Sequence, residues 1–147
     1  MRRWALLAIV AVVAAGCGGE EDLAASGPGA AAVRKYENLY AGHFERAWNE
    51  LHPAHQRIVS RARFARCARA AIAVGDLESI EVLDVFDDDI RIAGIPERRA
   101  KAVRVRVSSF QGESFTAEDH EVKVGDDWRW VLNTPAVEAY RQGRCPR

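Results

Sequence analysis

An uninterrupted apolar run, Trp4–Ala15, stands near the start of this chain of 147 residues and restricts what the rest can fold into. The run follows two arginines and ends at Gly16 and Cys17. A positive start, an apolar stretch of about 7–15 residues and small residues at its end are the parts of a secretory signal. The run is shorter than the roughly 20 residues that span a bilayer. We therefore expect residues 1–16 to be an export signal that is removed from the folded protein.

The end of this run, Ala14-Ala15-Gly16-Cys17, resembles the lipobox of bacterial lipoproteins. The resemblance implies cleavage before Cys17, a lipid on its sulfur, palmitate among its acyl chains, and attachment to the extracytoplasmic face of the cell membrane. The alternative is an ordinary signal peptide with a chance cysteine at the cut. Residues 17–30 would then be the lipidated cysteine and a flexible tether, because glycine, alanine, serine and acids there form no apolar face.

The remaining residues, 31–147, are enough for one domain with a real core. The whole chain balances 21 basic against 21 acidic residues. A near-neutral domain has no overall field that attracts nucleic acid. We therefore expect no nucleic-acid partner, and no sequence motif indicates a cofactor.

Two cysteines, Cys67 and Cys145, remain if Cys17 carries lipid. An even pair in an oxidising compartment indicates a disulfide, which would tie the helical part of the domain to its C-terminal tail. The alternative is two buried free thiols, which the position of Cys145 close to the end of the chain disfavours.

Apolar residues recur at steps of three and four in the first half of the domain, which predicts helices. We expect helices at 31–41 and 43–51, separated by Gly42, and a third that begins after an N-cap at Ser60 and ends at Gly75.

The second half is rich in β-forming residues. Alternation of valine with polar residues over 102–110 is typical of a half-buried strand. The expected strands are 77–86, 90–95, 102–110, 115–124 and 128–133, with a turn at 87–89. Thr134 and Pro135 predict the N-cap and first position of a short last helix. The fold class is therefore α+β, with N-terminal helices packed on a curved antiparallel sheet.

Three stretches resemble the nuclear transport factor 2-like superfamily, also described as the cystatin-like cone. They are Tyr40–Trp48, Ser60–Phe64 leading into Cys67, and Val124–Leu132 with its closing tryptophan. The resemblance implies a conical cavity between the helices and the sheet. Some members carry out acid–base chemistry in that cavity and others only bind ligands or partners, so the fold alone does not decide the function.

The resemblance suggests a base and a hydroxyl donor inside the cone. His120 is the candidate base, because it shares strand parity with Val122 and Val124, and Tyr40 is the candidate donor. The alternative is an exposed histidine at a strand edge. The expected cavity-lining aromatic residues are Tyr36, Tyr40, Trp48, Trp128 and Trp130.

Two further groups raise the question of a metal. His52 and His55 offer two imidazoles, but zinc needs further ligands, so a polar loop is the interpretation. Asp87–Asp89 lacks the alternating oxygens and glycine of a calcium loop. We expect no metal site.

The resulting hypothesis is a lipid-anchored envelope protein that binds a small apolar ligand or another envelope protein without catalysis. One alternative is a small isomerase- or dehydratase-like enzyme that uses His120 and Tyr40. A second alternative is a structural spacer or regulatory module.

Overall fold

The computed structural model describes residues 22–25 and 27–146. The expected export signal and Cys17 lie outside the described residues. Helices and strands follow one another in the order α1 (Gly27–Tyr40), α2 (Phe44–Asn49), α3 (Pro53–Gln56), α4 (Arg61–Ala71), β1 (Leu77–Asp89), β2 (Arg99–Ser109), β3 (Ser114–Val124), β4 (Asp127–Trp130) and α5 (Thr134–Arg141). The α+β class expected from the sequence is thereby confirmed.

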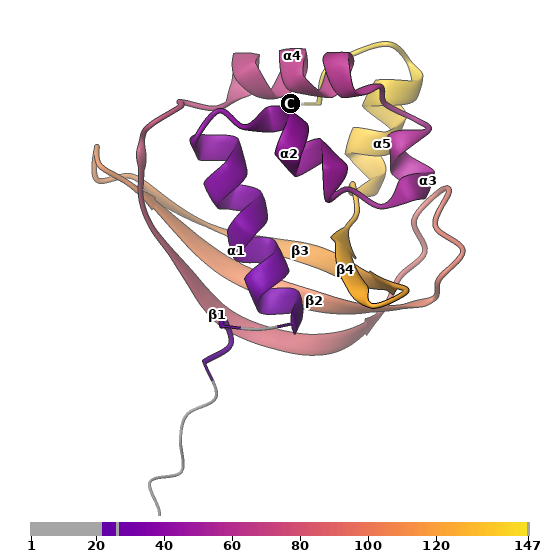
Figure 1. Cartoon of the computed structure of the whole chain (residues 1–147), viewed down its shortest axis with the longest axis horizontal. Helices are drawn as coiled ribbons and strands as arrows, with labels where there is room; N and C mark the ends of the chain where they lie inside the picture. Colours follow the sequence, from indigo (N-terminus) through magenta and orange to yellow (C-terminus); the bar gives the residue numbers. More distant parts are fainter. Residues whose placement is uncertain (1–21, 26, 147) are drawn as a thin grey trace, which may run out of the picture.

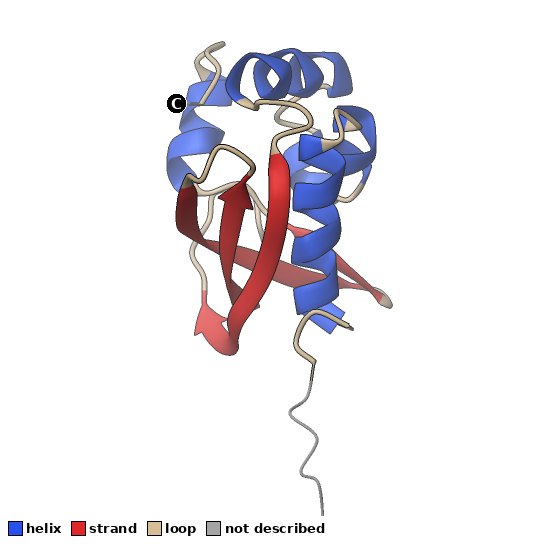
Figure 2. Ribbon diagram, turned by 90° about the vertical axis from the view of Figure 1, so that its left-hand side faces the viewer, coloured by secondary structure: helices blue, strands red, loops and turns tan. Residues whose placement is uncertain are grey.

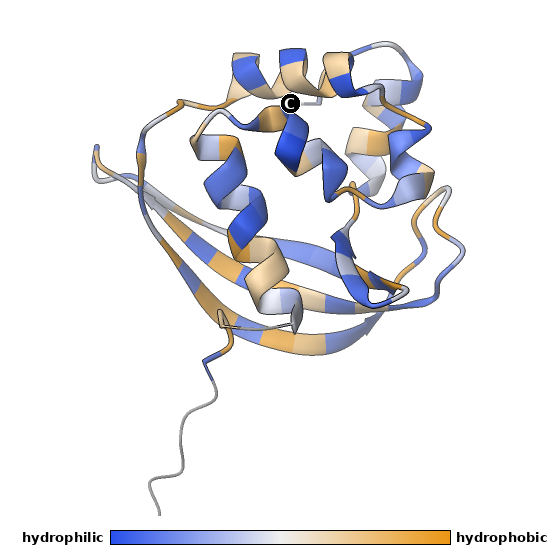
Figure 3. Cartoon of the chain, in the orientation of Figure 1, coloured by the Kyte–Doolittle hydropathy of each residue, from blue (hydrophilic) through white to orange (hydrophobic). Residues whose placement is uncertain are grey.

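The four strands form one antiparallel sheet in the order β1-β2-β3-β4, which is not closed. Figure 1 shows the sheet curving beneath α1, while α2, α4 and α5 gather at one end of the molecule. Figure 2 shows α1 running alongside the strands, with the other helices beyond the sheet. Strand residues alternate between hydrophobic and hydrophilic along β2 (Figure 3), as a sheet with a helix on one face requires.

Helix α1 begins at Gly27, four residues before the expected start, so the last part of the expected tether is helical. Pro28 suits a first helical turn, where its missing N–H has no partner to lose. The turn at 23–25 lies directly on the helix, since a Cβ atom at Gly29 would be 1.7 Å from the carbonyl oxygen of Leu23. Only glycine allows that approach.

The next helices follow the sequence signals closely. Gly42 has a φ of 75°, a conformation that glycine adopts easily, and it separates α1 from α2. The hydroxyl oxygen of Ser60 accepts a hydrogen bond from the backbone N–H of Arg63, 3.4 Å away, which confirms Ser60 as the N-cap of α4. The expected third helix ends earlier than Gly75, because Ile72 already has extended backbone.

Two expectations for the first strands are wrong. Asp87–Asp89 is the end of β1 and not a turn, because its residues pair with the basic end of β2. The Asp87 carboxylate lies 2.8 Å from the Lys101 ammonium, so opposite charges face each other across the ladder. The segment 90–95 is a loop and not a strand, and it buries the side chains of Ile90 and Ile95.

The C-terminal part departs from expectation by a few residues. β4 ends at Trp130, and the N-cap of α5 is Asn133 instead of Thr134, since the Asn133 side chain accepts from the N–H of Ala136 at 2.9 Å. The expected disulfide between Cys67 and Cys145 is present, with Cα atoms 5.4 Å apart. It ties α4 to the tail that follows α5.

The buried hydrophobic side chains among the described residues form three clusters, and two of them border the candidate site. One lies between α1 and the sheet, where Ala32 and Tyr36 pack on Val103 and Val105. The other lies among α2, α4 and α5 and includes Trp130. The candidate site described next is at their junction.

Candidate functional site

A pocket of about 280 Å³ opens among α1, α4, α5 and the end of β4. We call it the helix pocket. Its walls are mostly apolar and include Leu39, Ala68, Ile72, Trp130 and Tyr140. Cys67 and Pro146 also line it, so the disulfide holds the C-terminal tail as part of the wall. Apolar walls with a few polar groups are the usual make-up of small-molecule sites.

Lys35 is the unusual member of this wall. Its residue exposure is 6 %, although lysine is almost never buried unless it is paired. Its ammonium lies 2.5 Å from an Asp119 carboxylate oxygen. It also lies 4.3 Å from the centre of the Tyr36 ring and 5.4 Å from that of Trp130, both within cation–π range. One charged atom is thus held where two aromatic walls meet.

Glu121 lies in the sheet behind Lys35 and has no exposed surface at all. Neither of its carboxyl oxygens has a hydrogen-bond partner among the described residues. Burial raises the pKa of Glu121 to about 8, against the opposing effect of the Lys35 charge and with a further increase from Asp119. Burial therefore favours the protonated form of this carboxyl group.

Tyr36 completes the polar end of the helix pocket. Burial raises the pKa of its hydroxyl well above the usual range, and the neighbouring Asp119 carboxylate raises it further. The hydroxyl therefore stays protonated and acts as a hydrogen-bond donor beside Asp119. Lys35 and Tyr36 both supply donors here, while Asp119 supplies the one charge that balances the ammonium.

His120 does not lie in this pocket, and the expected inward parity is wrong. The side chains of β3 that face α1 are those of Asp119 and Glu121, since Asp119 contacts Lys35 and pairs with the buried Val103 of β2. The His120 ring instead places its Nε2 atom 2.8 Å from the Asp88 carboxylate of β1. The residues of β3 that face α1 are therefore the odd-numbered ones, Asp119 and Glu121, and not the even-numbered set that contains His120.

Tyr40, the expected donor, packs against the cluster beneath the C-terminal end of α1. The pKa of its hydroxyl is raised by burial and by Asp76, a residue of the loop before β1. His120 has Asp88 as its partner, so the structure does not bring the two candidate catalytic side chains to one ligand position. The arrangement therefore gives no support to an enzyme that uses His120 as the base and Tyr40 as the donor.

The five expected cavity-lining aromatic residues divide into two groups. Tyr36 and Trp130 line the helix pocket, whereas Tyr40, Trp48 and Trp128 are not part of its wall. The indole N–H of Trp48 donates to the carbonyl oxygen of Val59 at 2.8 Å, so this ring fixes the segment before α4. The indole N–H of Trp130 donates to Ala47 at 2.9 Å and leaves only the ring for a ligand.

His52 and His55 are buried and do not form the expected polar loop. The Nδ1 atom of His55 accepts from the backbone N–H of Leu132 at 2.9 Å, which requires Nε2 to carry the hydrogen and donate to the carbonyl oxygen of Ala93 at 3.2 Å. His52 caps α3 through Nδ1 and contacts Glu97 through Nε2. In the part of the chain that the structure describes, no three histidine, cysteine or acidic residues are grouped to hold a metal ion.

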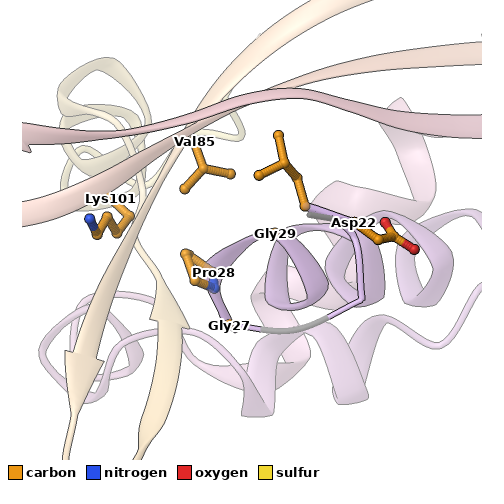
Figure 4. Close-up of a pocket in the computed structure, with 7 residues that line it drawn as sticks. Asp22, Gly27, Pro28, Gly29, Val85 and Lys101 are labelled. Carbon is orange, nitrogen blue, oxygen red and sulfur yellow. The ribbon is translucent and has the colours of Figure 1, made fainter. Parts of the chain in front are cut away.

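A second pocket of about 280 Å³ lies at the other end of α1 (Figure 4). Pro28 at the start of the helix, Val85 on β1 and Lys101 on β2 surround it, and Asp22 and Leu23 complete the wall. The Lys101 ammonium forms an ion pair with the Asp87 carboxylate. This pocket has no buried polar group of the kind found at the helix pocket, so it is the weaker candidate.

Lys35, Asp119 and Glu121 were not candidates from the sequence. Lys35 lies between Arg34, which suits the surface, and Tyr36, which suits the core. Its neighbours therefore do not show which way the Lys35 side chain points. The acids of β3 sit in a strand with polar residues on both faces. Their inward direction follows only from the pairing of Asp119 with Val103, which needs the strand register.

The described residues contain no helix that is both long and apolar enough for a membrane span. Comparison of the sequence with protein-family models and with curated proteins finds no match. The helix pocket therefore has to be interpreted from its own geometry.

Proposed function

We propose that this protein is a cell-envelope lipoprotein whose domain binds a small, mostly apolar ligand in the helix pocket. The observation that carries the proposal is the pocket itself: its mostly apolar wall includes a buried, paired lysine, with Tyr36 and Trp130 beside it. A pocket with a few polar groups at one end selects a ligand by fit and orientation. Nothing in this arrangement supplies a nucleophile with its activating base, so binding is the function that the geometry supports best.

We assign the domain to the nuclear transport factor 2-like superfamily as part of the same proposal. The order of helices followed by an antiparallel meander supports the assignment, as does α1 lying across the sheet. The helix pocket would then occupy the inside of the cone, with α4 and α5 at its wide end. The assignment places the ligand site where this superfamily keeps its cavity.

Photolabelling of the full-length chain in phosphatidylcholine vesicles tests the binding function. The probe is an eight-carbon 2-ketone that carries an aliphatic diazirine in its tail, and peptide mass spectrometry identifies the labelled residues. We expect the label on Leu39, Ile72 or other walls of the helix pocket, and we expect unlabelled 2-octanone to compete. Labelling that is confined to the pocket around Val85, or that 2-octanone does not reduce, would refute this site.

The lipid anchor is a separate part of the proposal, supported by the sequence around Cys17. Cells grown with labelled palmitate should incorporate the label into the parent chain, and not into Cys17→Ser. One acyl chain gives only marginal membrane binding, so the multiple chains of a lipoprotein are needed for stable attachment. A parent chain that stays unlabelled and soluble contradicts the anchor without affecting the helix pocket.

A further inference from the structure

We infer that the outer face of α4 is a docking surface for an acidic helix of a partner protein. This face carries four arginines, and we call it the arginine face: Arg61, Arg63, Arg66 and Arg69. Other residues of the same helix, such as Ala68, line the helix pocket, so the two surfaces use different sides of α4. The inference is therefore independent of the ligand proposed for the helix pocket.

Positive charge is concentrated in this part of the chain. Residues 51–75 contain five arginines and no acidic residue. Among the described residues, none of the four guanidinium groups of the arginine face forms a salt bridge, whereas those of Arg34 on α1 and of Arg104, Arg106 and Arg129 on the sheet each pair with an acid. The fold thus leaves its unbalanced positive charge on α4, and the matching partner is anionic.

Two of the four arginines are held in place by aromatic rings of neighbouring α2. The Arg61 guanidinium lies 5.1 Å from the centre of the Trp48 ring, and that of Arg69 lies 5.4 Å from the centre of the Phe44 ring. A side chain that is already restricted loses less conformational entropy when it binds. A guanidinium also stays charged and presents paired N–H donors to a carboxylate. The arginine face is therefore prepared for carboxylate groups in fixed positions.

The spacing of the arginines matches that of acids on a helix. Arg63, Arg66 and Arg69 follow one another at intervals of three residues, which is about 4.5 Å along a helix axis. Acids three or four residues apart on a second helix are about 4.5–6 Å apart, whereas same-face residues of a strand are about 6.7 Å apart. Ala62 and Ala70 are exposed on either side of Arg66, and their small side chains leave room for a second helix to approach.

A phospholipid surface is the less favourable occupant of the arginine face. Figure 1 shows α4 at the end of the molecule opposite the start of α1, which is the end nearer in sequence to the proposed anchor at Cys17. Membrane-surface helices also insert large apolar side chains among the lipids. The described large hydrophobic residues that are exposed all lie outside α4: Leu23, Val74, Phe110 and Phe115. A protein that approaches from the side away from the anchor fits both observations.

Binding of an acidic peptide to the full-length chain in phosphatidylcholine vesicles tests the inference. The probe is a fluorescein-labelled helical peptide of alanine and glutamate, in which the glutamates repeat every three or four residues along one face. Fluorescence anisotropy measures its affinity, which we expect to fall as salt is added because salt screens exposed charges. The inference is overturned by no binding at low salt, or by equal binding of a peptide with the same composition whose glutamates are spread around the helix. Complete displacement of the probe by phosphatidylglycerol vesicles, at a matched concentration of anionic groups, overturns it in favour of a lipid surface.

Two matched double variants locate the contact. Arg66→Ala with Arg69→Ala removes two charges from the arginine face, and Arg91→Ala with Arg98→Ala removes two exposed arginines from the loop between β1 and β2. We expect the first pair to lower the affinity for the peptide roughly tenfold, as the loss of two surface ion pairs would, and the second to change it by less than about twofold. Alanine favours helix, so the first variant should fold as the parent chain does. An unchanged affinity in the first variant, or an equal loss in both, contradicts a docking surface on α4.

Discussion

His55 and Glu121 are both fully buried, yet their hydrogen bonding differs completely. The His55 ring uses both nitrogens, one as an acceptor from Leu132 and the other as a donor to Ala93. The Glu121 carboxyl group has no partner among the described residues. A buried polar group that is fully bonded specifies the fold, whereas one without partners needs another explanation. We take His55 as the structural member of this comparison and Glu121 as part of the functional site.

The two groups also respond to pH in opposite directions. Burial lowers the pKa of His55 below its unfolded value of 6.5, so unfolding takes up a proton and stability falls as the pH drops through that range. Burial raises the pKa of Glu121 from 4.5 to about 8, so stability falls as the pH rises between those values. His55 thus lowers the stability on the acidic side of the pH profile, and Glu121 lowers it on the alkaline side.

The largest expected loss of stability comes from removing the His55 side chain. His55→Ala leaves the Leu132 N–H and the Ala93 carbonyl oxygen without partners and creates a cavity. We expect a loss of about 5 kcal/mol in the free energy of unfolding. Urea unfolding followed by tryptophan fluorescence measures it, with His55→Gln as a milder variant if the alanine variant does not fold. A loss below about 1 kcal/mol, the size of one ordinary hydrogen bond, contradicts the structural role.

The disulfide gives the next effect, because it fixes one wall of the helix pocket. Cys67→Ser with Cys145→Ser removes a link between residues 78 positions apart. The chain-entropy account predicts a loss of about 4 kcal/mol in unfolding free energy. Pro146 would no longer be held at the pocket, so photolabelling should fall as well. The parent chain treated with a reductant should show the same two changes, and a parent that keeps both properties after reduction disagrees with this account.

Glu121→Gln tests whether the buried carboxyl group makes the stability depend on pH. The amide keeps the shape but does not ionise, so the variant should be more stable than the parent by about 4 kcal/mol at pH 8. The two proteins should have similar stability below about pH 3.5, where the carboxyl group is protonated in both the folded and unfolded states. Urea titrations at several pH values measure the difference. An equal pH dependence in the parent and the variant shows that Glu121 does not titrate as described.

The smallest effect is expected at His120. Its pairing with Asp88 is partly exposed, and such pairs contribute roughly 0–1 kcal/mol. His120→Ala should therefore change the unfolding free energy by at most about 1 kcal/mol and leave photolabelling of the helix pocket intact. Unfolding and labelling measured side by side with His55→Ala make the contrast direct. Loss of labelling in His120→Ala would show that His120 contributes to ligand binding in the helix pocket.

The sequence predicted those parts of the fold that depend on local pattern. The valine alternation of β2, the Ser60 cap and the glycine break at Gly42 each act within a few residues, and each is found. The disulfide followed from the number of cysteines and the compartment. These signals need no knowledge of what packs against them.

The remaining errors come from contacts between distant segments. Three aspartates looked like a turn, but Lys101 and Arg99 face them across the ladder and keep them in β1. The inward face of β3 depended on register with β2 and on the position of α1, and neither is encoded locally. This is why the candidate base was placed at His120 when the buried acid is Glu121.

The most direct test of the central claim compares two tryptophan substitutions on α4. Ala71 lines the helix pocket and Ala70 does not, although both are exposed at the surface. We predict that Ala71→Trp fills the pocket and abolishes labelling of Leu39 and Ile72 by the diazirine ketone. Ala70→Trp should label as the parent chain does. Equal labelling of the two variants would contradict the claim that the helix pocket is the binding site.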